Sequence, residues 1–140
     1  MTKKYELVLN YIKDLSVEVP DSETFIISRE QISKYVMGIN INSKALKNKM
    51  IEVITKLEYK DPGHSKKKSY FEILYASVIK VKEENLDKKV LEKIILCDLQ
   101  NEIYPKLEKI FLGVIKDAGF PDLKFEKKID FEQLYNQRLN

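Results

Sequence analysis

The sequence predicts an α-rich α+β fold, in which three helices and a β-hairpin are followed by a C-terminal helical segment. Apolar residues recur at the three- and four-residue spacing of amphipathic helices along most of the chain, and apolar and polar residues alternate over 70–75. The composition, 44% hydrophobic and 34% charged in 140 residues, is that of a folded chain with one core of ordinary size.

The N-terminal third predicts two helices with a short strand between them. Helical spacing from Lys3 to about Leu15 indicates the first helix, which Pro20 and the residues after it end. A run of one aromatic and two β-branched residues at 25–27 is typical of one brief strand. Ser28, followed three residues later by Gln31, forms a capping box, so we expect a second helix over 29–37.

A third helix is expected over 44–57. Gly38 stands where the second helix needs a residue that tolerates positive φ, and the polar residues at 40–43 offer turn and capping side chains. The core stripe is then formed by Leu46, Met50, Val53, Ile54 and Leu57. Ile51 lies on the side of this expected helix that faces away from the core, where a large apolar residue contacts a neighbouring element or a ligand.

The hairpin follows at Asp61–Gly63, a strong turn signal, and carries His64 and a lysine run at 66–68. Residues 70–82 continue as one bent strand or as two. Helical periodicity returns after Asn85, and Pro105 either kinks that helix or opens a new one. An apolar stripe over 103–118 and a last short helix after Asp130 complete the chain.

The order helix, strand, helix, turn, helix and hairpin over residues 3–82 resembles the winged helix-turn-helix superfamily. The resemblance implies that 28–37 is a supporting helix, that 43–57 is a recognition helix in the major groove of DNA, and that 62–68 is a wing along the backbone. The chain would then divide into a winged helix-turn-helix domain, 1–85, and a C-terminal helical region, 86–140, that dimerises or packs.

The distribution of charge along the chain agrees with a DNA-binding domain. Residues 43–70 carry eight lysines against three carboxylates, the only strong charge asymmetry in the chain. We therefore expect double-stranded DNA as partner, bound by a transcriptional regulator or replication accessory factor. The candidate DNA-binding residues are Ser43, Lys44, Lys47, Asn48, Thr55, Lys66, Lys67 and Lys68.

An alternative from another class is a protein-interaction adaptor built on the same scaffold. Ile51, Glu52 and the presence of only two arginines favour it, since arginine is the residue that reads guanine bidentately. The apolar stripe of the C-terminal region is either core or the seam of a homodimer. The residues of that seam would be Leu107, Ile110, Phe111, Val114 and Ile115.

Catalysis is not expected. The single histidine, His64, reads as an exposed turn residue and the single cysteine, Cys97, as a core thiol, so the sequence predicts neither a metal site nor a cofactor. The N-terminus is too charged for a signal peptide, and no run approaches the ~18 apolar residues of a membrane span. We therefore expect a cytoplasmic protein that does not contact a membrane.

Overall fold

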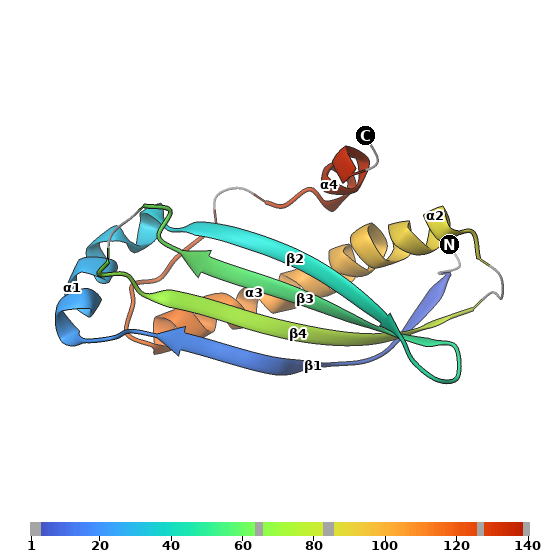
Figure 1. Ribbon diagram of the computed structural model, residues 1–140, viewed down its shortest axis with the longest axis horizontal. Helices are drawn as coiled ribbons and strands as arrows, with labels where there is room; N and C mark the ends of the chain where they lie inside the picture. Colours follow the sequence, from blue (N-terminus) through green and yellow to red (C-terminus); the bar gives the residue numbers. More distant parts are fainter. Residues whose placement is uncertain (1–3, 64–65, 83–85, 126–127, 139–140) are drawn as a thin grey trace.

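A computed structural model describes residues 4–63, 66–82, 86–125 and 128–138. Its centre is one antiparallel sheet of four strands in the order β1-β4-β3-β2 (Figure 1). The strands are β1 (Tyr5–Glu18), β2 (Val36–Ala45), β3 (Met50–Lys60) and β4 (Tyr70–Val81). The two edges of the sheet are therefore β1 and β2.

The helices lie at one end of the sheet and across one of its faces. A helix, α1 (Ser22–Gln31), and a 3-10 turn, η1 (Ile32–Lys34), connect β1 to β2 at one end. A continuous helical rod then covers one face, and a short helix ends the chain (Figure 1). These are α2 (Lys88–Lys93), the π-helical turn η2 (Ile94–Asp98), α3 (Leu99–Asp117) and α4 (Phe131–Arg138).

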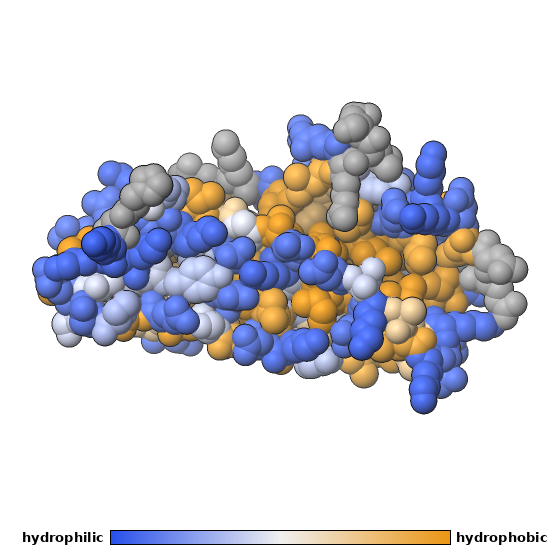
Figure 2. Space-filling model, in the orientation of Figure 1, coloured by the Kyte–Doolittle hydropathy of each residue, from blue (hydrophilic) through white to orange (hydrophobic). Residues whose placement is uncertain are grey.

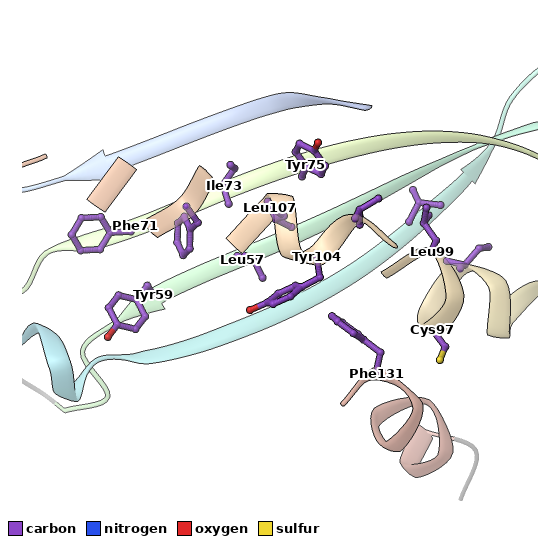
Figure 3. Packing of buried hydrophobic residues seen from close by; sticks show 14 of the residues in the cluster. Leu57, Tyr59, Phe71, Ile73, Tyr75, Cys97, Leu99, Tyr104, Leu107 and Phe131 are labelled. Atoms are coloured by element: carbon purple, nitrogen blue, oxygen red, sulfur yellow. The ribbon is translucent and has the colours of Figure 1, made fainter. Parts of the chain in front are cut away.

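The core lies between the sheet and α3. Along β3 every second side chain is buried, from Val53 to Tyr59, and the register places them beside Phe71, Ile73 and Tyr75 of β4. The apolar stripe of α3 covers these residues (Figure 3). We call this the helix face of the sheet and the opposite side the open face.

A buried polar bridge ties α3 to the sheet. The side-chain amide of Gln100 donates to the Ile95 carbonyl at 3.2 Å, and its oxygen accepts from the Thr55 hydroxyl at 3.1 Å. The π-helical turn changes the ordinary pairing of the helix backbone, and Gln100 supplies a partner for one carbonyl of that turn. Both side chains are fully buried, so the bridge fixes α3 on β3.

The predicted α-rich winged helix is wrong. The expected first helix is the 14-residue strand β1, and the expected third helix, 44–57, is the end of β2, a tight turn and most of β3. The second expected helix is displaced: α1 begins at Ser22 and includes the segment 25–27 that was expected as a strand. Residues 43–57 therefore do not form the expected recognition helix.

The physical reason is that the apolar residues of these segments fit both the 3.6-residue period of a helix and the two-residue period of a strand. In 44–57 the residues Val53 and Leu57 are four apart, which fits a helix, but Val53, Thr55, Leu57 and Tyr59 also alternate as in a strand. Thr55 was assigned to the polar side of a helix, whereas it is buried because Gln100 provides a hydrogen-bond partner. Tertiary pairing decided the outcome.

Predictions that depend on local signals are confirmed. The turn at Asp61–Gly63 joins β3 to β4, with the Gly63 amide donating to the Asp61 carboxylate at 2.8 Å. Of the two alternatives left open for residues 70–82, the structure shows one long strand, over 70–81. The C-terminal region is helical, with Pro105 inside α3, and the last helix begins after Asp130, whose carboxylate accepts from the Gln133 amide at 3.0 Å.

Candidate functional site

A groove runs between the β2 edge of the sheet and the C-terminal segment of the chain. One wall is formed by Tyr35, Met37 and Ile39 at the start of β2, with Tyr59 of β3. The other wall comes from residues 122–125 and 128–137, including α4, and the cavity measures about 1220 Å³. Because both walls belong to a single chain, the groove is a property of the fold itself.

Aromatic rings fix the floor of the groove. The Tyr59 ring lies 5.7 Å from Tyr35 and 5.4 Å from Phe125, measured between centroids. The Tyr59 hydroxyl donates to the Ile32 carbonyl at 2.7 Å, and burial raises the pKa of the Tyr59 hydroxyl. A ring held by packing on its faces and by a hydrogen bond at its tip offers a rigid apolar surface.

The outer wall, α4, is held at two points. Phe131 is buried against Tyr104 of α3, with ring centroids 5.3 Å apart (Figure 3), and the Tyr135 hydroxyl donates to the Lys89 carbonyl at 3.1 Å. The Tyr104 hydroxyl also contacts the Met37 sulfur at 3.7 Å, which joins this wall to β2. Leu134 lines the groove and is 42% exposed.

Apolar residues at the surface extend beyond the groove. Figure 2 shows them gathered around α4 and the neighbouring part of the sheet, whereas the end near α1 is hydrophilic. On the other edge of the sheet six large apolar side chains are 39–48% exposed: Val8, Leu9, Tyr11, Ile12, Leu15 and Val17 of β1. An edge strand of this kind is typical of a protein that contacts other polypeptides.

The open face carries charges that largely compensate each other. The Tyr70 hydroxyl oxygen lies 2.7 Å from a Glu58 carboxylate oxygen and 3.0 Å from a Glu72 carboxylate oxygen, so its single proton is shared between these two acceptors. The Lys56 ammonium lies 3.7 and 3.6 Å from the same two carboxylates. The hydrogen bond from Tyr70 lowers the pKa of Glu58. These groups satisfy one another on the sheet surface and form no cleft.

The predicted DNA-binding residues are not brought together. Ser43 and Lys44 end β2, and Lys47 and Asn48 lie in the β2–β3 turn, where Asn48 has a φ of 62°. Lys66, Lys67 and Lys68 lie at the opposite end of the sheet, beyond the eleven residues of β3, which span roughly 35 Å. Lys67 forms an ion pair with Glu23 there, and Thr55 is fully buried.

The residues proposed for a dimer seam divide into two groups. Leu107, Phe111 and Ile115 are fully buried against the sheet of their own chain. Ile110 and Val114 are half-buried on the flank of α3. His64 lies outside the described residues, and Cys97 is buried, with a pKa raised by burial. Within the described ranges, no group of three or more His, Cys, Asp or Glu could hold a metal ion, and no helix is long and apolar enough to span a membrane.

The groove residues were missed because their signal was assigned to other elements. Met37, Ile39 and Ile41 alternate with Gly38, Asn40 and Asn42, which is a strand pattern, but 29–37 was interpreted as a helix and 38–43 as a turn. The apolar residues Leu123, Phe125 and Ile129 show no period, and only their position beside β2 gives them a role.

Comparisons with known proteins agree with a protein-binding site. The family model described as "Preprotein translocase subunit SecB" matches residues 2–140. A putative protein-export protein SecB of Pelagibacter ubique is 55% identical over the full length of both chains. The protein-export protein SecB of Rhodopseudomonas palustris (strain BisA53) is 28% identical, over 96% of this chain and 81% of its own.

One solved structure shares the fold. The SecB-like chaperone of Mycobacterium tuberculosis, in complex with a ChAD peptide from the HigA1 antitoxin, superimposes with a TM-score of 0.67 at 10% identity, covering 89% of this chain and 91% of that one. Together with the family match, this likeness overturns the resemblance to the winged helix-turn-helix superfamily. It also removes the basis for double-stranded DNA as the partner and for roles in transcription or replication.

Proposed function

Because this chain belongs to the SecB family, we propose that it is a non-enzymatic protein-export chaperone that holds non-native preproteins in the groove between β2 and α4. The name of the family refers to preproteins, and we propose that this chain meets them in the cytoplasm, before export. The adaptor alternative is thereby closer to the function than DNA binding was.

One observation carries the proposal: the groove has an apolar, aromatic floor and a polar rim. The floor residues, among them Tyr59 and Phe125, offer contacts that depend on apolar area more than on sequence. The rim carries Asp122, Lys124, Lys128 and Asp130, so it has no dominant charge. A site of this composition suits apolar segments of many different chains, which a folded protein buries and a non-native one exposes.

The proposal is tested by placing one charge on each wall. Leu134→Asp introduces a carboxylate at a groove-lining position of α4 that is 42% exposed, so it costs little folding free energy, and Ile39→Asp introduces one at a half-buried groove-lining position of β2, with circular dichroism checking the fold. Matched controls are Asn136→Asp on the same helix and Asn40→Asp on the same strand, both exposed and outside the groove lining. The probe is a chemically unfolded preprotein, diluted into buffer and titrated with chaperone.

We expect the groove variants to bind the unfolded preprotein at least tenfold more weakly, because the carboxylate would be desolvated by an apolar segment. The controls should bind as the wild type does. Wild-type affinity in both groove variants would refute the site.

We also propose that the exposed apolar side chains of β1 are covered by a second copy of the chain. β1 is the longest strand, and six of its large apolar side chains face solvent in a single chain. A second copy of the same edge would remove that surface from water and pair the backbone groups that an edge strand leaves free.

A further inference from the structure

The turn between β2 and β3 projects beyond the end of the sheet, on the side away from α1 (Figure 1). The Leu46 amide donates to the Met50 carbonyl at 2.8 Å, and the Met50 amide donates to the Lys47 carbonyl at 3.4 Å. Asn48 and Lys49 lie between these bonds, and both have a φ of 62°. Two successive left-handed residues are typical of a type I′ turn, so this turn has one defined backbone shape.

Lysine at the second left-handed position of the turn is unusual. Glycine adopts this conformation without strain, and Asn-Gly is a pair that type I′ turns favour. The chain instead places Lys49 after Asn48. Strained backbone conformations cluster where function needs the side chain, so Lys49 indicates that a positive charge is required at this turn.

Exposed lysines surround the turn. In the register of the sheet Lys80 lies opposite Met50, and beyond it the Lys82 amide donates to the Lys4 carbonyl at 3.1 Å. Because three strand spacings amount to about 14 Å, the ends of the four strands lie close together. The six exposed lysines at this end of the sheet, which we call the basic tip, are Lys4, Lys44, Lys47, Lys49, Lys80 and Lys82.

The carboxylates near the basic tip leave much of its charge unbalanced. At the same strand ends Glu6 and Glu52 lie opposite lysines of the tip, but Glu52 is already held in an ion pair with a lysine of β1. Residues 83–84, both glutamates, lie outside the described residues. Within the described ranges Lys44 and Lys47 form no ion pair. Their charge is therefore available to an anionic partner.

An exposed apolar side chain stands among these lysines. Leu46, between Lys44 and Lys47, is 37% exposed. Lysines that flank a leucine suit the interface of a lipid bilayer, where ammonium groups stay with the headgroups and the leucine reaches the acyl boundary. A nucleic acid or an acidic polypeptide offers no such apolar layer. The basic tip also contains no arginine, the residue whose planar fork suits fixed phosphates.

We propose that the basic tip docks this protein on the anionic surface of a lipid bilayer, with the lysines at the headgroups and Leu46 at the acyl boundary. The contact is peripheral and reversible, because a few lysines and one leucine hold a protein far less firmly than a membrane-spanning helix does. It differs from the expectation that the protein does not contact a membrane, and it does not depend on the groove. Its effect would be to bring a client to the membrane across which export proceeds.

Co-sedimentation with lipid vesicles tests the proposal. The probes are vesicles of phosphatidylcholine alone and vesicles of phosphatidylcholine mixed equally with phosphatidylglycerol, which is anionic. The double variant Lys44→Gln with Lys47→Gln removes two charges of the basic tip. Its matched control, Lys66→Gln with Lys68→Gln, removes two exposed lysines from the opposite end of the sheet, so both variants have the same net charge.

We expect the protein to bind the mixed vesicles at least tenfold more strongly than phosphatidylcholine vesicles, and more weakly as salt screens the charges. Each lysine near an anionic surface strengthens binding about fivefold, so the tip variant should bind at least tenfold more weakly than the wild type. The control variant should change affinity by less than about threefold. Equal affinity of the two variants, or equal affinity of the protein for the two kinds of vesicle, would overturn the proposal.

Leu46→Ser distinguishes a bilayer from another polyanion. The variant keeps every charge, so we expect at least threefold weaker binding to the mixed vesicles with an unchanged dependence on salt. Unchanged affinity would refute the placement of Leu46 at the acyl boundary. Binding of polyglutamate as tight as that of the vesicles would assign the basic tip to an acidic polypeptide, and would also refute the proposal.

Two variants at position 49 separate the charge from the backbone. Lys49→Gly and Lys49→Gln both remove the ammonium, but only glycine adopts a φ of 62° without strain, so Lys49→Gly should melt at the higher temperature. We expect both to bind the mixed vesicles about fivefold more weakly than the wild type. Wild-type affinity in both would refute the need for a charge there. Leu134→Asp in the groove should keep wild-type affinity for the vesicles, and a loss there would show that lipid occupies the groove and would overturn the basic tip as the site.

Discussion

The hydrogen-bonded bridge between Thr55 and Gln100 allows a quantitative test of how α3 is fixed on the sheet. Thr55→Val keeps the volume of the side chain but leaves the Gln100 oxygen, fully buried, without its partner. An unsatisfied buried group costs about 1–3 kcal/mol, so we expect a loss of about 1–2 kcal/mol in the free energy of unfolding. Gln100→Leu leaves the Thr55 hydroxyl without its partner, removes the side-chain donor to the Ile95 carbonyl and places an apolar side chain beside both, and should cost about 2–4 kcal/mol.

The double variant distinguishes a bridge from two independent polar groups. With valine at 55 and leucine at 100, no hydroxyl or amide remains to be satisfied, so the double variant should be no less stable than Gln100→Leu alone. The coupling energy would then be about 1–2 kcal/mol. Urea denaturation followed by circular dichroism, at one fixed protein concentration, measures all four proteins. Additive losses would show that the two residues act separately and would refute the bridge.

Three further predictions concern other parts of the chain. Tyr70→Phe should raise the pKa of Glu58, because the hydrogen bond from Tyr70 lowers it, and carboxyl titration by NMR checks that pKa. A group with a depressed pKa stabilises the fold above its unfolded-state pKa and loses this contribution as pH falls. The variant should therefore lose less stability on acidification than the wild type. Cys97 is buried with a raised pKa, so a thiol reagent should label it slowly under native conditions and rapidly in denaturant, and fast native labelling would contradict the described packing. Leu9→Asp with Tyr11→Asp should reduce the sedimenting mass if β1 pairs two copies, whereas Lys44→Asp at the exposed end of β2 should not, and an unchanged mass in the double variant would refute that interface.

The C-terminal half shows what local sequence can establish. The residues of α3 from Ile103 to Ile115 repeat at helical spacing for several turns, and a helix makes its backbone hydrogen bonds within itself. The turn at Asp61–Gly63 depends on side chains within three residues. Such elements could be predicted because the groups that stabilise them are adjacent in the chain.

The strands β1, β2 and β3 show the opposite case. Leu7, Tyr11 and Leu15 fit a helix by spacing, but β1 is held by pairing with β4, more than fifty residues away. In β3 the buried Thr55 could not be distinguished from a surface residue without Gln100, which is 45 positions later. Where the spacing of apolar residues fits both a helix and a strand, the structure of the segment is decided by the strands it pairs with, and residue spacing does not reveal those strands.

The groove depended most on tertiary structure. The sequence by itself determined the helical C-terminal region and the presence of strand structure after the basic turn, but not whether residues 70–82 form one strand or two. Only the tertiary structure decided that Met37 and Ile39 stand beside Phe125 and Leu134, since a groove between a strand and a distant helix exists only when long-range pairing fixes where each lies. The lysines that indicated DNA were separated to opposite ends of the sheet by the same pairing, because a strand extends a segment by about 3.4 Å per residue where a helix would have kept it compact.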